Sequence, residues 1–265
     1  MPSILDTIVE YKATKVGERK KDCSLKTIKE IASKQEPTRG FLKALNNNNV
    51  ARRPSIIAEC KKGSPSKGVI VPDYKAERIA VGYEEAGATC LSVLTDTKFF
   101  HGANNDLISV KKSCALPILR KDFIIDSYQI YETKAIGADC ILLIVSCLTD
   151  QQLDEFFHIS IDIGLDVLIE VHDRMELERA LRLRSPLIGI NNRNLKIFET
   201  DIFNTVTLMK DIPDDRLIIS ESGISTRKDI EILQKSGVNS FLIGETFLRS
   251  PNPFEKMREL FPELK

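Results

Sequence analysis

The sequence predicts an α/β fold, a (β/α)₈ TIM barrel with an N-terminal helical extension. From residue 55 onward, eight short runs rich in Ile, Leu and Val recur, separated by longer amphipathic stretches. The runs show little alternation of apolar and polar residues, which is typical of parallel strands buried on both faces. A length of 265 residues suits one such barrel. The predicted strands are 55–60, 90–94, 117–121, 140–145, 166–171, 187–191, 216–220 and 240–244.

The stretches between the runs carry helical patterns, and several end in glycine. Gly87, Gly137, Gly164 and Gly237 each close such a stretch, and glycine is a common helix stop. Repeated strand–helix units favour a closed barrel. An open, doubly wound sheet is the alternative, because counting strands does not prove closure. The first run is not followed by a glycine-rich dinucleotide fingerprint, which disfavours that alternative.

The first 50 residues precede the first predicted strand. Within them we expect a helix, a charged loop and two short helices, the helices over Ile4 to about Lys15, Leu25–Ser33 and Phe41–Leu45. The asparagine run at 46–49 and Pro54 interrupt the helical pattern. Because this segment is short for a second domain, we predict a single domain over 1–265. Its extension (1–50) is expected to pack on the barrel (51–265).

Charge and composition exclude several classes of partner. Lys plus Arg and Asp plus Glu number 38 each, so no net basic field favours nucleic acid. The apolar runs are far too short to span a membrane, and the N-terminus lacks the regions of a signal peptide. The six cysteines form no CxxC pair and no zinc-ligand spacing. We therefore expect reduced core cysteines and a cytoplasmic protein.

Charged and polar residues stand at the ends of five predicted strands. Buried strands should end in apolar residues and turns, because isolated buried charge is costly. In a barrel, these carboxyl ends hold the chemistry. Side chains alternate along a strand, so Glu59 and Lys61 share one face, as do Asn191 and Arg193. The strand-end residues are Glu59, Lys61, Lys121, Glu170, Asn191, Arg193, Glu221 and Ser222.

Lysine and glutamate converging on one cavity would favour proton transfer. Burial and neighbouring charges shift pKa values. We expect desolvation to make a lysine a usable acid and a buried glutamate a usable base near neutral pH. The alternative is a ring of ion pairs that only holds the barrel mouth together. Charge at five strand ends at once favours the catalytic interpretation.

Glycines after the last two strands predict a phosphate site. Gly223 follows the seventh run, and Gly244 and Glu245 stand at the end of the eighth. Barrels often bind phosphate in these two loops, where glycine lets backbone N–H groups approach the anion. Ser64 and Arg193, after the first and sixth strands, would add donors, since arginine suits phosphate geometry. An ordinary turn role is the alternative for each glycine.

The three histidines are weaker candidates. His101 lies in the loop after the second strand, His158 lies within a predicted helix, and His172 follows the fifth strand just beyond Glu170. Their spacing does not form a metal-ligand set, so we expect no metal site. The serines lack the context of a nucleophile elbow, so acyl transfer is not expected.

The motifs near the strand ends carry a close family resemblance. They are IIAECKKGSPSKG (56–68), LSVLTDTKFFHG (91–102), ILRKDFIIDSYQIYE (118–132), DCILLIVSCL (139–148), LIEVHD (168–173), IGINNRNLKIFETD (188–201), SESGIS (220–225) and FLIGETFLRS (241–250). In this order they resemble the indole-3-glycerol phosphate synthase family of tryptophan biosynthesis. The SPS, RKDF, NNRNL and ESGI segments together are highly specific. The helical extension is also a family feature, so the likeness covers essentially the whole chain.

The resemblance implies a carboxy-lyase without metal or organic cofactor. Its substrate would be 1-(2-carboxyphenylamino)-1-deoxyribulose 5-phosphate, whose indole ring closes with loss of CO₂ and water. By resemblance, Lys121 is the general acid at the ribulose carbonyl carbon, and Glu170 shuttles a proton in the later step. Glu59 is an alternative for that step, and Lys61 should pair with Glu59 and meet the substrate carboxylate. The resemblance further assigns Asn191 and Glu221 to hydroxyl or ring positions, Ser222 to the anthranilate side, and Ser64, Arg193 and the backbone around Gly223, Gly244 and Glu245 to the phosphate.

Some residues depart from the family pattern. Gly63 stands where Ala or a basic residue is commoner, and His101 stands where Gln is frequent. The stretch Ala103-Asn104-Asn105 is also unusual. These loops would cover the substrate, so the departures concern affinity more than reaction type.

Two rival functions remain open from the sequence. A phosphoribosylanthranilate isomerase would need a Cys or Asp acid–base pair at strand ends, and Cys60 faces away from Glu59 and Lys61 by alternation. A barrel that only binds a phosphorylated ligand and regulates a partner would not need several titratable groups facing one carbon. For partners, we expect a small phosphorylated substrate and a monomer, with association with other tryptophan-pathway enzymes as an open alternative.

Overall fold

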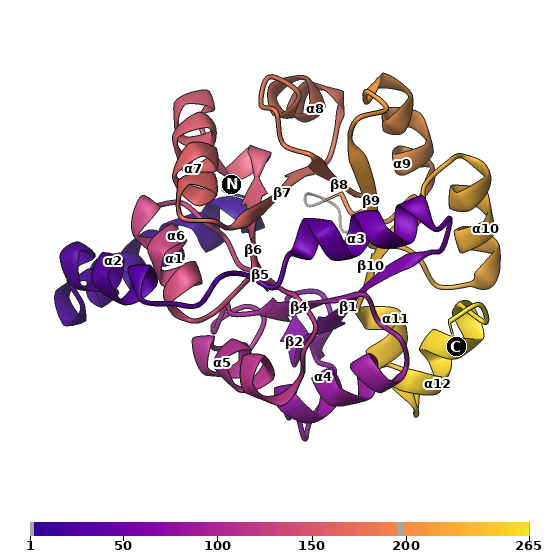
Figure 1. The fold of residues 1–265 in the computed structure, drawn as a ribbon, viewed down its shortest axis with the longest axis horizontal. Coiled ribbons are helices and arrows are strands. Elements are labelled where there is room, and N and C mark those ends of the chain that lie inside the picture. Colours follow the sequence, from indigo (N-terminus) through magenta and orange to yellow (C-terminus); the bar gives the residue numbers. More distant parts are fainter. Residues whose placement is uncertain (1–2, 195–198, 265) are drawn as a thin grey trace.

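Eight parallel strands close into a barrel in the order β1-β10-β9-β8-β7-β6-β5-β4 (Figure 1). The computed structural model describes residues 3–194 and 199–264. Because β1 pairs with both β4 and β10, the sheet is closed and the predicted barrel is confirmed. The predicted strand ends differ from the observed ones by at most one residue. The barrel strands are β1 (Ser55–Cys60), β4 (Cys90–Leu94), β5 (Ile118–Lys121), β6 (Cys140–Ile144), β7 (Asp166–Val171), β8 (Leu187–Asn191), β9 (Leu217–Glu221) and β10 (Ser240–Ile243).

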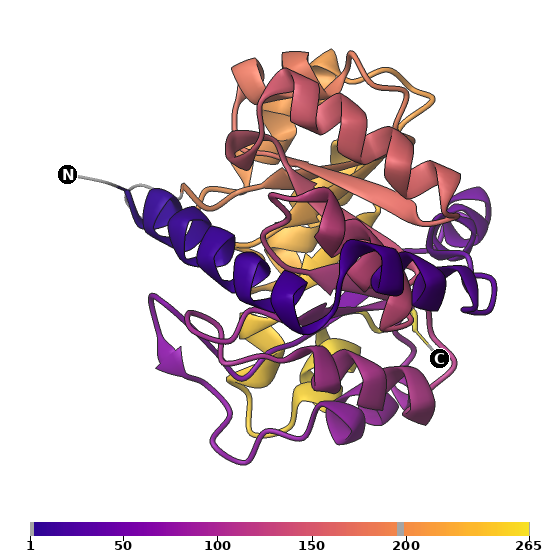
Figure 2. The same ribbon diagram turned by 90° about the vertical axis from the view of Figure 1, so that its left-hand side faces the viewer.

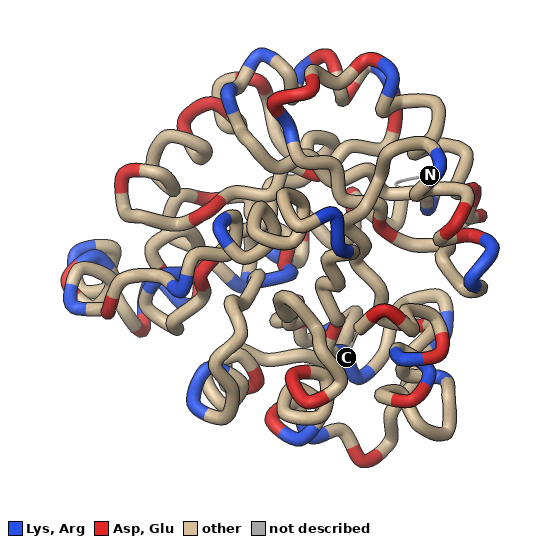
Figure 3. Tube along the Cα trace, turned by 45° about the vertical axis from the view of Figure 1, so that its right-hand side comes forward, with Lys and Arg blue, Asp and Glu red and all other residues tan. Residues whose placement is uncertain are grey.

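Helices surround the barrel, and a small hairpin of β2 (Gly63–Ser64) and β3 (Gly68–Val69) follows β1. Positive and negative residues are interspersed along the outer helices (Figure 3). Among the described residues, no helix is both long and apolar enough to cross a membrane. The outer elements are α4 (Ala76–Glu85), α5 (Asn104–Ser113), α6 (Ser127–Ala135), η1 (Val145–Cys147), α7 (Asp150–Asp162), α8 (Arg174–Ala180), α9 (Phe203–Leu208), η2 (Met209–Asp211), α10 (Arg227–Lys235), α11 (Glu245–Leu248) and α12 (Pro253–Leu260).

Alternating strand residues fill two different layers. On β1, Ile57 joins the core inside the barrel, whereas Ile56, Ala58 and Cys60 pack outward against the surrounding helices. This alternation, expected for a strand buried on both faces, places Glu59 on the inward side with Ile57. The same alternation directs the polar side chains at the strand ends into the barrel mouth.

The N-terminal helices cover opposite ends of the barrel. Helices α1 (Ile4–Asp22) and α3 (Phe41–Val50) flank α2 (Leu25–Ser33) in the chain. Phe41 and Leu45 of α3 are fully buried in the inner core, so α3 closes the amino end of the barrel. Figures 1 and 2 show α1 at the other end, beside the β2–β3 hairpin.

Two details of the extension differ from the sequence prediction. Helix α1 does not end near Lys15 but continues to Asp22 through the predicted charged loop. Ion pairs from Arg19 and Lys20 to α6 and its N-cap fix this last part. The asparagine run at 46–49 lies inside α3 rather than ending it. One of its members, Asn48, donates its side-chain amide to the carbonyl of Pro54 and the hydroxyl of Thr89, so tertiary contacts override weak helix propensity.

Candidate active site

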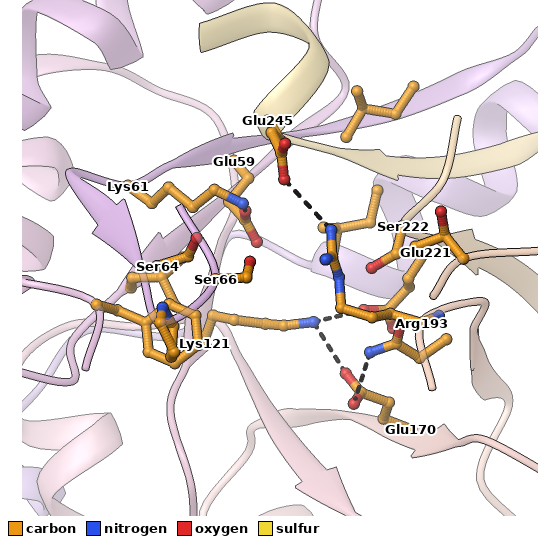
Figure 4. A pocket seen from close by; sticks show the side chains of 18 of the residues that line it. Glu59, Lys61, Ser64, Ser66, Lys121, Glu170, Arg193, Glu221, Ser222 and Glu245 are labelled. Atoms are coloured by element: carbon orange, nitrogen blue, oxygen red, sulfur yellow. Dashed lines mark hydrogen bonds and ion pairs between the residues drawn. The ribbon is translucent and has the colours of Figure 1, made fainter. Parts of the chain in front are cut away.

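A cavity of about 460 Å³ opens at the carboxyl ends of the strands. The sheet register sets the strand ends level, with Glu170 beside Ile144 and Asn191 beside Glu221. The polar side chains therefore point into one space (Figure 4). The cavity is lined by every residue predicted for the site, namely Glu59, Lys61, Ser64, Lys121, Glu170, Asn191, Arg193, Glu221, Ser222, Gly223, Gly244 and Glu245.

The ammonium group of Lys121 lies between two carboxylates at the centre of this cavity (Figure 4). Its Nζ is 2.9 Å from Glu170 Oε2 and also donates to Glu221 Oε2. Asn191 Nδ2 donates to Glu170 Oε1 at 3.1 Å. Four strands, β5, β7, β8 and β9, thus bring one side chain each to the same point. We call Lys121, Glu170 and Glu221 the mouth cluster.

Contacts within the mouth cluster shift its pKa values. Burial alone would lower the pKa of Lys121, but the carboxylates of Glu170 and Glu221 raise it above its usual value. The expected effect of desolvation is therefore present, but the attraction of the carboxylates outweighs it. Burial, with the charge of Glu170, raises the pKa of Glu221 to about 8 despite Lys121. For Glu170, burial is outweighed by Lys121 and His172, which hold its pKa below the usual value.

Two glycines make room for the buried carboxylates. A Cβ on Gly189 of β8 would lie 2.2 Å from Glu221 Oε1, and a Cβ on Gly244 would lie 2.4 Å from Glu59 Oε1. Neither distance is compatible with an unmoved carboxylate, so a side chain at either position would displace the charged group. Gly244, which was predicted to bind phosphate, is thus also needed because a side chain there would collide with Glu59.

Lys61 and Glu59 form the expected ion pair on the inward face of β1. Lys61 Nζ lies 2.6 Å from Glu59 Oε1. Cys60, between them, is fully buried in the outer core and does not line the cavity. The cysteine that an isomerase would use is therefore on the wrong side of the strand.

The residues predicted for phosphate all line the cavity, from the hairpin after β1 and the loops after β8, β9 and β10. Arg193 donates to Glu245 Oε2 at 3.2 Å. Ser64 Oγ is buried, with no hydrogen-bond partner in the described part of the chain. Ser222 and Gly223 have φ angles of 65° and 76°, a conformation that is uncommon for serine and typical of functional loops. Residues 195–198, part of the motif that contains Arg193, lie outside the described residues.

The sequence analysis missed an apolar wall of the cavity. Ile4, Leu5 and Ile8 of α1 line it, together with Phe100 and Phe123 from loops after β4 and β5. The spacing of Ile4 and Ile8 places both on one helix face, which was a visible signal. The surface that this face would meet was not visible in the sequence.

A second charge cluster surrounds Arg120, the residue before Lys121 on β5, and one of its members, Asp122, also lines the cavity. We call it the outer network, and it comprises Arg120, Asp122, Glu132, Lys12 and Asp96. Arg120 is fully buried and pairs with Asp122 at 3.2 Å and Glu132 at 2.7 Å. Lys12 of α1 pairs with Asp96 at 2.9 Å and Asp122 at 2.6 Å. Burial alone would raise the pKa of Asp122, but Lys12 and Arg120 lower it to about 2, so this network fastens α1 over the mouth.

The histidines fall in three different surroundings. His172 adjoins the mouth cluster, with Nε2 3.3 Å from Glu170 Oε1, so the sequence analysis undervalued it. His158 is exposed on α7. His101 is exposed, and a Cβ on Gly63 would lie 2.8 Å from its ring. Two of the departures from the family pattern are therefore neighbours, and Gly63 leaves space for His101.

Comparison with known proteins decides the family. The model of the indole-3-glycerol phosphate synthase family matches residues 5–260. An indole-3-glycerol phosphate synthase from Polaromonas sp. strain JS666 is 48% identical over 98% of this chain and 99% of its own length. The chain belongs to the indole-3-glycerol phosphate synthase family. It is accordingly a carboxy-lyase of tryptophan biosynthesis, and the resemblance in the strand-end motifs is confirmed.

Solved structures outside this family share its fold. The tryptophan synthase α subunit of Legionella pneumophila covers 86% of this chain and all of its own, with a TM-score of 0.61 and 12% identity. The 3-hexulose-6-phosphate synthase of Salmonella typhimurium covers 79% of this chain and 98% of its own, with a TM-score of 0.63 and 11% identity. At such low identity these likenesses show the barrel alone, and the synthase family assignment rests on the sequence matches.

Proposed function

We propose that this chain closes the indole ring of 1-(2-carboxyphenylamino)-1-deoxyribulose 5-phosphate, with Lys121 as the general acid. The observation that carries the proposal is the position of Lys121 Nζ, held between Glu170 and Glu221 in the cavity. Because the charge of Glu170 raises its pKa, Lys121 is protonated at neutral pH and has a proton to donate.

In the ring-closing step, the aromatic carbon that bears the carboxyl group attacks the ribulose carbonyl carbon. A proton from Lys121 to the carbonyl oxygen neutralises the developing alkoxide as the carbon–carbon bond forms. Loss of CO₂ then restores the aromatic ring. Carboxylates fixed near the developing cationic intermediate stabilise its charge without reorganisation, which is how preorganised groups lower a barrier.

In the dehydration step, Lys121, reprotonated from solvent, protonates the new hydroxyl group, which leaves as water, and a second group removes a proton from the adjacent carbon that bears the nitrogen. We assign proton removal to Glu170, whose lowered pKa keeps it ionised. Glu59 is the alternative, but its carboxylate is paired with Lys61. Glu221, with a pKa raised to about 8, keeps a proton at neutral pH and can donate a hydrogen bond to a substrate hydroxyl, as can the amide of Asn191.

The remaining residues would bind the two anionic ends of the substrate. Lys61 would meet the substrate carboxylate, and Ser222 would face the anthranilate ring. Arg193, Ser64 and the backbone N–H groups near Gly223, Gly244 and Glu245 would bind the phosphate. The buried hydroxyl of Ser64 has no hydrogen-bond partner among the described residues, which supports this assignment because buried polar atoms usually have partners. Arg193 would then exchange Glu245 for phosphate or bind both.

A direct assay tests the proposal. The purified protein receives the carboxyphenylamino-ribulose phosphate without added metal or cofactor, and indole formation is followed by fluorescence. General acid catalysis typically contributes about 10² to 10⁴-fold, so Lys121→Ala should lose at least about 3 kcal/mol of transition-state stabilisation. Circular dichroism of the variant controls for folding. Absence of indole fluorescence with the wild-type chain would favour a non-catalytic binder, and an unchanged rate in Lys121→Ala would remove Lys121 from the chemistry.

A further inference from the structure

His172 lies between two carboxylates, beside the site but outside the roles described above. It directly follows β7, and its side chain is 12% exposed. Its Nδ1 is 3.0 Å from Glu176 Oε2 on α8, and its backbone N–H donates to that same oxygen at 2.8 Å. On the other side of the ring, Nε2 is 3.3 Å from Glu170 Oε1. The imidazole is thus held at both nitrogens by acidic side chains.

We propose that His172 is a positioning residue, an inference that rests on the proposed role of Glu170 in proton transfer. Glu176 holds the His172 imidazole as a cation, and this cation fixes the Glu170 carboxylate that Lys121 also contacts. Asn191 and Lys121 already donate to the two oxygens of Glu170. His172 adds a second positive charge on the far side. In the described structure its Nε2 makes no aligned hydrogen bond, so its contribution is mainly electrostatic.

The charges around Glu170 explain why a second cation is needed. Lys121 is shared with Glu221, so one ammonium group faces two carboxylates. Two like charges that share one partner cannot both ionise easily. An imidazolium beside Glu170 favours ionisation of Glu170 over that of Glu221. As a result, Glu170 can accept a proton, whereas Glu221 holds one.

The titratable groups that face His172 support its positive charge. Burial would lower its pKa, but Glu170 from β7 and Glu176 from α8 raise it to about 10. Cys147 on η1 also faces the two glutamates, and burial together with their charges raises the pKa of its thiol. That thiol is therefore neutral at neutral pH. Along Glu176, His172, Glu170 and Lys121, the charges alternate in sign.

Replacing His172 should alter the chemistry rather than substrate binding. Loss of the partners that orient metal ligands typically costs about 10- to 100-fold in affinity or activity, and we take the lower end of that scale for the partner of a carboxylate. We expect His172→Leu to lower kcat about tenfold, with KM within about twofold. The acid limb of its kcat profile should move up by about one pH unit, as the pKa of Glu170 rises. His172→Gln, which keeps a donor but not the charge, should recover part of kcat and keep the shifted limb. His158→Gln, an exposed histidine on α7, is the matched control and should change neither.

A measurement on the unaltered protein keeps the inference testable if His172→Leu does not fold. NMR titration should show the His172 imidazole protonated through pH 8 in the wild-type chain, with a lower midpoint in Glu176→Gln. A wild-type midpoint near the ordinary value of about 6.5 would overturn the proposal, as would an unshifted acid limb in His172→Leu. Lys121→Ala separates the two ideas. If Lys121→Ala is inactive and His172→Leu keeps the wild-type pH profile, only the role of His172 fails. If Lys121→Ala is fully active, the proposed function fails, and the role of His172 that builds on it fails too.

Discussion

Arg120 and Lys121 are neighbours on β5, yet their side chains enter two different kinds of charge cluster. Arg120 lies in the outer network with every nitrogen of its guanidinium engaged, and its acceptors are Thr95 Oγ1, the Gln129 carbonyl, Thr133 Oγ1, Asn104 Oδ1, Asp122 and Glu132. Lys121 lies in the mouth cluster beside the cavity. There, Glu221 Oε1 is buried without a hydrogen-bond partner in the described part of the chain.

The difference shows what each cluster can do. The buried guanidinium of Arg120, with all its nitrogens engaged, rigidifies the structure around it, but it has no free donor to offer a ligand. An incomplete network costs stability, and its unpaired atoms are available to a substrate. The outer network should therefore govern stability, and the mouth cluster should govern activity.

The largest effect that would sharpen this comparison is expected for Arg120→Met. Removing one partner from a buried ion pair typically costs about 3 to 5 kcal/mol, because the other charge stays buried and uncompensated. The free energy of unfolding, from urea titration, should fall by that amount, while kcat per folded molecule stays within about twofold. The matched control Lys112→Met, at an exposed position on α5, should change stability by less than about 0.5 kcal/mol. A large loss of kcat in folded Arg120→Met would mean that the two clusters are not separate.

A smaller effect is expected for Arg193→Ala at the phosphate side of the mouth. A hydrogen bond to a charged group contributes about 1.5 to 3 kcal/mol, so KM should rise roughly 10- to 100-fold while kcat stays within about threefold. Steady-state kinetics by indole fluorescence measures both. The control Arg182→Ala, an exposed residue paired with Asp150, should leave KM unchanged. If instead kcat collapses at constant KM, Arg193 belongs to the chemistry.

The smallest effect concerns the pH dependence of stability. Because the pKa of Glu221 is raised from its unfolded value of 4.5 to about 8, the folded chain binds this proton more tightly. Its contribution to stability is complete below about pH 4.5 and is lost as the pH rises toward 8. Between pH 6 and 7, the ionisation of Glu221 should lower the free energy of unfolding of the wild-type chain by at most about 1.4 kcal/mol. Glu221→Gln should lack this decrease. Urea titrations of both chains at the two pH values measure this. Parallel pH dependences would show that Glu221 ionises in the folded chain as it does in the unfolded one.

The barrel and the inward residues could be predicted because they depend on local pattern. Dense apolar runs mark strands buried on both faces, and alternation along β1 places Glu59 and Lys61 inside and Cys60 outside. The family motifs then named the residues that line the cavity. All of this information lies within a few residues of each strand end.

The outer network could not be predicted because its members are distant in the sequence. Lys12 pairs with Asp96 and Asp122, and no local pattern connects a charged helix residue to loops so far along the chain. The net rise in the pKa of Lys121 could not be predicted for a related reason. The sequence shows that a lysine is buried, but the balance between burial and attraction depends on how near two carboxylates lie. His172 was undervalued because a metal-ligand search does not detect a histidine that serves a carboxylate.

The placement of Arg120 and Lys121 on opposite faces of β5 also bears on how the chain folds correctly. A shift of one residue in the pairing of β5 with β4 would turn every side chain to the other face. A shift in one direction would put Lys121 in the place of Arg120, and a shift in the other direction would put Arg120 in the place of Lys121. Such a chain would lose both the mouth cluster and the outer network. An error in register that removes the activity would therefore also lower the stability. The stability of the fold therefore favours the correct register of β5, whether or not a substrate is bound.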